Sequence, residues 1–374
     1  MTRGVDKIRN REASEGTILI LSRYGPVGAS SRTRLFEYLP FLRARGLAVQ
    51  VQSLLSDDYL TRKYRGEQVG TWTIGAAYWK RLKFLLRSSK SAAIWLEKEL
   101  WPYLPFGIES RVLAGRKIIV DIDDAVFHNY DQHKSAVVRR LLGQKLDLIF
   151  GISTLVTAGS AYLAKRALDA RAPRVEVLPT VVNFNSYAAV RRVPSSGFTV
   201  GWIGSPATQG LLSPVIGVLA EVLSGEADRF VTVGSKFGRR LFPKHEEWQW
   251  GRDTEVRQVS QFSVGIMPVP DRPFERGKCG YKLIQYMASG IPVVASPVGE
   301  NKSIVRHGES GFLVETLEEW RKALIALKQD GGLRIRMGEM GQRIASEQYS
   351  LEKTGPKVAN WMAEVANGPL PRGE

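Results

Sequence analysis

The sequence predicts an α/β protein of two domains, each with a parallel sheet that helices cover on both faces. Short apolar runs alternate with helical patterns along the chain, which is typical of such sheets. The length of 374 residues exceeds what one hydrophobic core usually supports. A charged segment with proline, serine and glycine, RRVPSSG, interrupts the alternation near its middle. We therefore expect a loose N-terminal arm at 1–16, a first domain at 17–190, a linker at 191–197, a second domain at 198–350 and a terminal helix within 351–374.

The first domain is expected to begin with a strand at residues 17–21 and a helix at 35–45, which Gly46 ends. Further apolar runs predict strands at 48–54, 117–122, within 146–154 and at 175–178. The basic and aromatic region after residue 57 is expected to contain helices around 78–86 and 93–100.

The second domain is expected to open with a strand at residues 198–203. Its other predicted strands are at 230–233, 264–269 and 291–295. The segment 281–289 places Leu283, Ile284 and Met287 at helical spacing, and Gly290 supplies the stop. A last helix is expected at 351–365.

The polar loop at 271–280 predicts a ligand that carries phosphate. It follows a buried strand, contains Arg272, Arg276 and Lys278, and leads directly into a helix. Ligands of open parallel sheets bind at the carboxyl ends of the strands. A helix that begins there offers free backbone N–H groups to an anion.

Four consecutive motifs in this region resemble the donor-binding half of the retaining nucleotide-sugar glycosyltransferases of family 4, which have the GT-B fold. They are GKCGYKLIQYMASG at 277–290, IPVVAS at 291–296, PVGEN at 297–301 and GESGFLV at 308–314. The resemblance implies two Rossmann-like domains that face a central cleft, and a last helix that crosses back to the first domain. It also implies that the turn with Gly299 and Glu300 lines the nucleoside or sugar pocket.

The donor loop departs from the family pattern, which has one glutamate in the loop and a second on the helix. Alignment on YMASG puts Gly277 and Gln285 at these positions. Gln285 can still bond a ribose hydroxyl through its amide. Glu275 can replace the first glutamate if the loop is remodelled.

A second departure concerns the Arg/Lys pair that the family uses to hold the diphosphate, after the first strand of the second domain. Residues 201–223 contain no Lys or Arg. That loop instead holds Gly204, Ser205, Thr208 and Gln209. Lys278 and Lys282 lie four residues apart near the start of the donor helix, on one side of it and with the helix dipole behind them. We expect these two lysines to bind the diphosphate, with Arg276 in reserve.

The loop at 22–34 of the first domain is a candidate acceptor or phosphate site. Its sequence places Gly28, Ser30 and Arg32 around the start of a helix, where hydroxyl, guanidinium and N–H groups suit an anion. The alternative is an ordinary helix N-cap with surface arginines.

The segment DIDDAVFH at 121–128 places three carboxylates at the end of a strand. Strand alternation points Asp121 and Asp123 to one face and Asp124 to the other. The resemblance implies that Asp124, His128 and Glu275 hold the donor sugar, although a lone histidine is more often structural. Three acids could also hold Mg²⁺, but the resemblance implies catalysis without a metal or a resident cofactor.

Positive charge is concentrated in the first domain. Residues 1–190 contain 29 Lys and Arg against 17 Asp and Glu (+12), whereas the rest contain 24 against 20 (+4). One basic cluster, at 80–90, is interleaved with aromatic and aliphatic residues, which suits an anionic bilayer surface. The alternative is a solvated helix face. We expect peripheral membrane contact, a lipid-linked or anionic glycan acceptor and no nucleic acid, because no nucleic-acid module is recognised.

The single cysteine, Cys279, excludes an intrachain disulfide and fits a reducing compartment. No run of about 18 apolar residues is present, and the start of the chain lacks the apolar run of a signal peptide. The expected location is cytoplasmic, at the inner face of the membrane.

These observations predict transfer of a sugar from a nucleotide-diphosphate donor to a hydroxyl acceptor with retention of configuration, in bacterial surface polysaccharide or glycolipid assembly. Catalysis would consist mostly of alignment and of stabilising the departing diphosphate. Two alternatives are a non-catalytic sugar-nucleotide-binding protein and a nucleotide-sugar epimerase of the same fold.

Overall fold

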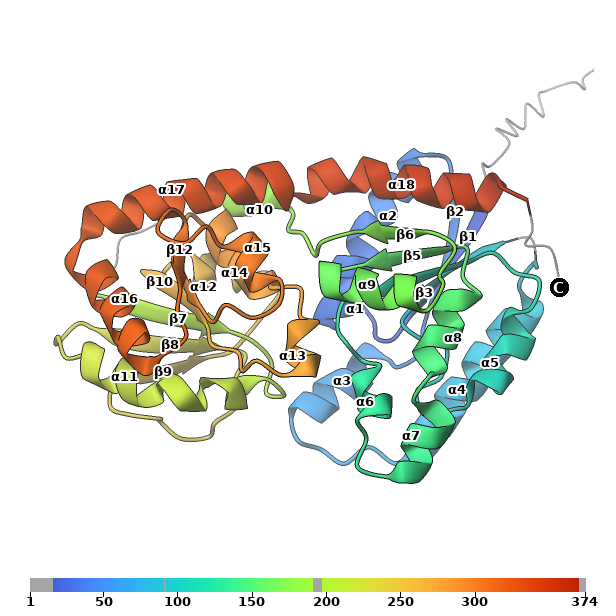
Figure 1. The fold of residues 1–374 in the computed structure, drawn as a ribbon, viewed down its shortest axis with the longest axis horizontal. Helices are drawn as coiled ribbons and strands as arrows, with labels where there is room; N and C mark the ends of the chain where they lie inside the picture. Colours follow the sequence, from blue (N-terminus) through green and yellow to red (C-terminus); the bar gives the residue numbers. More distant parts are fainter. Residues whose placement is uncertain (1–15, 91, 191–196, 370–374) are drawn as a thin grey trace, which may run out of the picture.

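The computed structural model describes residues 16–90, 92–190 and 197–369, which form two α/β domains side by side (Figure 1). The predicted arm and linker lie almost wholly outside these residues. Each domain contains one six-stranded sheet in which all neighbouring strands are parallel. The predicted fold class, two parallel sheets flanked by helices, is therefore confirmed.

The N-terminal sheet has the strand order β2-β1-β3-β4-β5-β6. Its strands are β1 (Thr17–Ser22), β2 (Ala48–Ser53), β3 (Ala93–Glu97), β4 (Ile118–Ile122), β5 (Leu155–Ala158) and β6 (Val175–Val177). The helices of this half are α1 (Ala29–Arg34), η1 (Phe36–Tyr38), α2 (Leu39–Ala44), α3 (Asp57–Tyr64), α4 (Thr71–Arg87), α5 (Phe106–Leu113), α6 (His128–Asp131), α7 (Ala136–Leu142), α8 (Lys145–Gly151) and α9 (Ala161–Asp169). The next helix, α10 (Phe184–Ala188), packs against the C-terminal domain.

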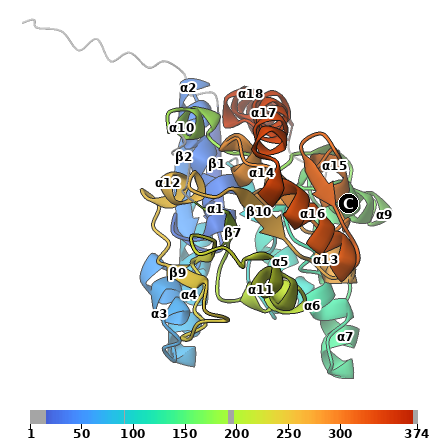
Figure 2. The same ribbon diagram turned by 90° about the vertical axis from the view of Figure 1, so that its left-hand side faces the viewer.

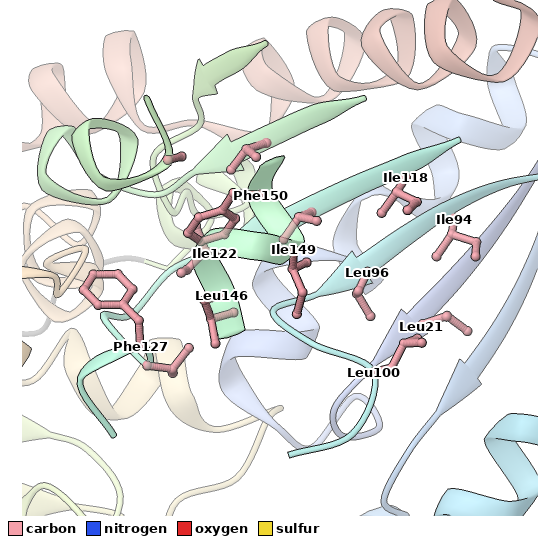
Figure 3. Packing of buried hydrophobic residues seen from close by; sticks show 14 of the residues in the cluster. Leu21, Ile94, Leu96, Leu100, Ile118, Ile122, Phe127, Leu146, Ile149 and Phe150 are labelled. Carbon is pink, nitrogen blue, oxygen red and sulfur yellow. The ribbon is translucent and has the colours of Figure 1, made fainter. Parts of the chain in front are cut away.

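The sheet separates two apolar clusters, because both of its faces are covered. On β1, Leu19 and Leu21 belong to one cluster, whereas Ile18 and Ile20 belong to the other. The first cluster packs the sheet against α8, whose Leu146, Ile149 and Phe150 point inward (Figure 3). Strands buried on both faces show no polar alternation, so an apolar run is their only sequence signal.

Two expectations for this domain are wrong. Residues 93–97 form a strand rather than a helix, and all five are buried between β1 and β4, where helical and strand runs look alike in sequence. The run within 146–154 belongs mainly to α8, because Leu146, Ile149 and Phe150 recur at helical spacing. The strand that was expected within this run begins after it, as β5 at Leu155. The helix expected at 35–45 is divided into η1 and α2, with Pro40 in the first turn of α2.

The C-terminal sheet has the order β12-β11-β10-β7-β8-β9. Its strands are β7 (Thr199–Ile203), β8 (Arg229–Val233), β9 (His245–Trp248), β10 (Val264–Met267), β11 (Val293–Ala295) and β12 (Gly311–Leu313). Its helices are η2 (Gln209–Val215), α11 (Ile216–Val222), α12 (Glu255–Val259), α13 (Pro273–Arg276), α14 (Tyr281–Ala288), α15 (Asn301–Ile304), α16 (Leu317–Gln329) and α17 (Gly331–Gln348). The strand order reverses between β7 and β10, and a ligand crevice is expected at the carboxyl ends of these two strands. β9 and β12 were not predicted.

A long helical segment connects the domains a second time. Figures 1 and 2 show α17 on the C-terminal domain and α18 (Leu351–Asn367) end to end along one side of the molecule. α18 buries Leu351, Val358 and Met362 against the N-terminal sheet. The ammonium of Lys117 also donates to the carbonyl oxygen of Ala366, at 2.6 Å. These contacts attach the end of the chain to the first domain.

Candidate active site

The loop before α14 contacts the segment that follows β4, so the carboxyl ends of the two sheets meet there. The Cys279 thiol donates to the backbone oxygen of Asp123 at 2.8 Å, and its side chain lies in the N-terminal apolar cluster. Gly277 packs on Ala125 so closely that an added Cβ would lie 2.5 Å from the Ala125 Cβ. A side chain at position 277 therefore has no room unless Ala125 moves.

Lys282 lies in the first turn of α14, and Lys278 lies beside this contact in the loop three residues before the helix begins. The expectation that the two lysines share one side of a helix is therefore wrong. Gly280, with φ +63°, makes the left-handed turn that directs the loop into the helix. No carboxylate of the described residues lies within 4 Å of either ammonium, whereas Lys282 lies over the Trp202 ring at 5.3 Å. Burial and the neighbouring Lys278 lower the pKa of Lys282 to about 8. Two cations thus lie together with no ion-pair partner within 4 Å among the residues that the structure describes, although the charge of Asp124 acts on Lys282 from further away.

The loop after β7 approaches the same lysines. A Cβ on Gly204 would lie 2.5 Å from the Trp202 ring and 3.0 Å from Cε of Lys282, so only glycine fits there without rearrangement. Ser205 and Thr208 form the turn that follows, in which the Thr208 hydroxyl donates to the Ser205 carbonyl at 3.1 Å. Gly204 is therefore brought to the lysines, at the point where the strand order reverses.

The N-terminal domain contributes Asp124 to this group. Burial and the adjacent Asp123 raise the pKa of Asp124, and the positive charges of Lys98, Lys278 and Lys282 partly offset the increase. Its neighbours Asp121 and Asp123 have other ion-pair partners. Asp121 forms a buried bidentate ion pair with Arg34, at 2.7 and 2.9 Å.

Asp123 is held by Lys98, which sequence reasoning missed. The Lys98 ammonium lies 2.8 Å from Asp123, and Ser30 donates its hydroxyl to the same carboxylate. Burial would raise the pKa of Asp123, but the positive charges of Lys98 and Arg34 outweigh it and lower the pKa to about 2. Lys98 follows β3 with φ +66°, at the place where a strand was mistaken for a helix. The structure thus places Ser30, one of the predicted site residues, against the Asp123 carboxylate.

Arg32 and Gln285 meet around Glu255, another residue that sequence reasoning missed. The Glu255 carboxylate accepts from Gln285 Nε2 at 2.8 Å and from Trp250 Nε1 at 2.6 Å. A guanidinium nitrogen of Arg32 lies 3.3 Å from it. The nearby Gly28 is the N-cap of α1 and packs on Tyr24. Arg32 is buried and paired across the domains, so it is not a surface arginine.

The remaining predicted residues lie at the margin of this arrangement. Both ring nitrogens of His128 have protein partners, Asp131 at 2.8 Å and Tyr162 at 2.9 Å. Glu300 accepts weakly from the backbone N–H of Ala161 at 3.4 Å, at the start of α9. Gly299 adopts φ +53° beside Arg276, and Glu275 lies half-buried on α13.

Among the residues that the structure describes, no group of three or more His, Cys, Asp or Glu side chains is arranged to hold a metal ion. No helix in the same residues has the length and apolar character needed to cross a membrane.

Comparisons with known proteins concern both the whole fold and the C-terminal domain. The family described as "Glycosyl transferases group 1" matches residues 222–330. N-acetyl-alpha-D-glucosaminyl L-malate synthase of Bacillus anthracis is 32% identical over 81 residues, which are 21% of this chain and 21% of that enzyme. The alignment thus spans about a fifth of that relative's length.

Solved structures match over nearly the whole chain. Anabaena HepE, in complex with UDP and glucose, has a TM-score of 0.67 at 16% identity, with 93% of this chain and 100% of that chain covered. Sucrose-phosphate synthase from Thermosynechococcus elongatus has a TM-score of 0.71 at 13% identity, with 94% and 99% covered. Together with the two parallel sheets, these matches show that the fold is of the GT-B type.

Proposed function

We propose that this protein transfers a sugar from a nucleoside-diphosphate donor to a hydroxyl acceptor, with retention of the anomeric configuration. The observation that carries the proposal is the pair of neighbouring cations Lys278 and Lys282, without a described carboxylate within 4 Å. Lys278 lies in the loop before α14, and Lys282 lies in the first turn of that helix beside Gly204. Two cations at a helix start and at a reversal of strand order suit a diphosphate. The match of residues 222–330 to the group 1 glycosyl transferases supports the same activity.

In this proposal the two lysines stabilise the negative charge that grows on the departing diphosphate. With a pKa of about 8, Lys282 is mostly protonated at pH 7. The bond from the anomeric carbon to the diphosphate oxygen breaks, and the bond to the acceptor oxygen forms on the same face. The acceptor proton passes to the departing phosphate oxygen, so no protein general base is required. Because the acceptor attacks on the face that the diphosphate leaves, no protein nucleophile is required either. Asp124 and Glu275 are proposed to hold the sugar, and Ser30 to face the acceptor.

His128 remains a proposed sugar contact, which requires its ring to exchange a present partner for a sugar hydroxyl. Gly299 and Glu300 are likewise proposed to line the pocket. Gln285 is a weaker candidate for ribose, because its amide already donates to Glu255 and Tyr187.

Donor cleavage tests the proposed function directly. The protein is incubated with UDP-glucose, UDP-N-acetylglucosamine, GDP-mannose and ADP-glucose, and release of the nucleoside diphosphate is followed. One donor should release its diphosphate, the freed sugar should keep its anomeric configuration by NMR, and Lys282→Ala should slow release by about 100-fold.

The same assay separates the alternatives. Binding without release would favour a non-catalytic sugar-nucleotide-binding protein, which is the second candidate because Gly277 and Gln285 lack the family's carboxylates. An altered sugar on an intact nucleotide would favour an epimerase.

We further propose a lipid-linked or anionic glycan as acceptor and contact with an anionic membrane through α4. Trp72, Trp79 and Leu86 of this helix are 90%, 56% and 70% exposed, and α4 contains no acidic residue. Arg81 is not part of this surface, because it is fully buried and donates to Gln52 at 2.7 Å. The exposed cations beside the three apolar side chains are Lys80, Lys83 and Arg87.

Binding to vesicles tests the membrane contact. Each cation near an anionic surface contributes about 1 kcal/mol. The pair of changes Lys80→Gln and Lys83→Gln should therefore lower the partition coefficient on phosphatidylglycerol vesicles by about 30-fold. The matched control, Lys353→Gln with Lys357→Gln on the exposed face of α18, should change it little. Equal losses in the two pairs would indicate an effect of net charge alone.

A further inference from the structure

A buried carboxylate, Glu255, connects three elements from both sides of the domain interface. It accepts from Trp250 and Gln285 and receives a longer hydrogen bond from the Tyr187 hydroxyl, at 3.3 Å. Arg32, from α1 of the N-terminal domain, completes the set at 3.3 Å and also lies over the Trp250 ring at 5.4 Å. Glu255 and Arg32 are only 6% and 4% exposed. All four donors therefore converge on one desolvated charge.

Two of the four partners of Glu255, Arg32 and Gln285, lie near the reacting groups of the proposed site in sequence. Arg32 is two residues after Ser30, which donates to Asp123. Gln285 is three residues after Lys282, one helical turn away on α14. Glu255 thus sets the separation between the carboxylate edge of the first domain and the lysine pair of the second.

We propose that Glu255 is a positioning residue for the transfer reaction. By holding Arg32 and Gln285 it fixes α1 against α14, so that donor and acceptor groups meet in a reactive alignment. This inference rests on the proposed function. Small displacements of reacting groups cost as much as about 100-fold in rate. Loss of the Glu255 charge should therefore lower kcat, whereas the lysines that bind the diphosphate remain in the second domain.

A purely structural ion pair would behave differently. Its loss would lower stability and weaken donor binding and turnover together. A positioning role predicts a separation of kcat from KM, and it predicts that Arg32 and Glu255 act as a unit.

The test compares Glu255→Gln, Arg32→Gln and the double variant with the wild type. Glu255→Gln keeps the size of the side chain and one acceptor oxygen, but it removes the charge and replaces the second acceptor oxygen with an NH2 group. The control is Glu221→Gln, which removes an ion pair of 2.6 Å with Arg321 that lies within the C-terminal domain.

Two readouts are taken on each protein. Hydrogen exchange of the backbone amides of α1 and α12 should accelerate by about tenfold in either single variant and no further in the double variant. With the donor selected by the release assay, kcat should fall by about 100-fold while donor KM stays within about threefold. The control variant Glu221→Gln should match the wild type in hydrogen exchange and in the kinetic constants.

Unchanged exchange at α1 in Glu255→Gln, additive effects in the double variant, or a loss shared between kcat and KM would overturn the inference. Because hydrogen exchange is measured without turnover, its result can refute the positioning role without refuting the proposed function. A wild type that releases no diphosphate refutes the proposed function and the positioning role with it. An active wild type with an unimpaired Glu255→Gln refutes the positioning role alone.

Discussion

The carboxyl edges of the two sheets face the same interface, but their charged side chains differ in whether they have ion-pair partners. At the N-terminal edge, Asp121 has Arg34 and Asp123 has Lys98, each within 3 Å. At the C-terminal edge, Lys278 and Lys282 have no described carboxylate within 4 Å. A buried charge without a partner is costly. The paired edge therefore has its charges compensated within the fold, whereas in our proposal a bound anion supplies the compensating charge at the unpaired edge.

This difference predicts that equivalent substitutions at the two edges have opposite consequences. Removal of a cation from the paired edge should cost stability. Removal of a cation from the unpaired edge should cost ligand affinity and little stability.

The largest effect is expected for Lys98→Met, which leaves Asp123 buried without its ammonium. Breaking a buried pair by removing one partner costs about 3–5 kcal/mol. Chemical denaturation should show this loss, and adding Asp123→Asn should recover part of it because the orphaned charge is then absent. The exposed control Lys302→Met should stay within about 0.5 kcal/mol of the wild type. A Lys98→Met protein as stable as the control would remove the distinction between the edges.

The contact of Gly277 with Ala125, here called the joint between the edges, is expected to tolerate little added volume. Ala at position 277 places a Cβ 2.9 Å from the backbone nitrogen of Ala125. Overpacking of this kind costs about 1–3 kcal/mol. Gly210→Ala is the matched control, because no atom lies within 4 Å of its added Cβ. The thermal midpoints of the two variants give the comparison, and equal midpoints would show that the joint is loose.

A smaller effect is expected in the pH dependence of nucleotide binding at the unpaired edge. The pKa of Lys282 is lowered to about 8, so its positive charge is present below that pH and lost as the pH rises through it. UDP affinity should be nearly constant from pH 6.5 to 7.5 and fall about fivefold between pH 8 and pH 9 if binding requires the charge. Titration of Lys282→Arg, which stays charged, should show no such decrease. A decrease shared by both proteins would have another cause.

Much of the fold could be predicted because alternating apolar runs are a local signal. β1, β7, β10 and α14 were placed within one or two residues. β3 and α8 were mistaken because a strand buried on both faces and a short amphipathic helix give similar apolar runs over five to seven residues. β9 and β12 were missed, since they are short and lie at the sheet edges.

The site was predicted unevenly for a related reason. Lys278, Lys282 and Gly204 lie in local motifs, and the structure brings them together. Lys98 and Glu255 were missed because their importance depends on partners distant in sequence. Lys98 binds Asp123, and Glu255 binds Arg32 across 223 positions. The signal that could have identified Lys98 was the charged run EKE directly after an apolar strand. Nothing local marks Glu255.

Isothermal titration of UDP, GDP, ADP and CMP tests most directly whether the lysine pair is a diphosphate site. One nucleoside diphosphate should bind the wild type, and Lys282→Ala should weaken that binding by about 10- to 100-fold, the value of a charge-assisted contact. The control Lys302→Ala, on the nearby α15, should change it less than about twofold. Equal affinity of wild type and Lys282→Ala, or no binding of any of the four nucleotides, would contradict the account.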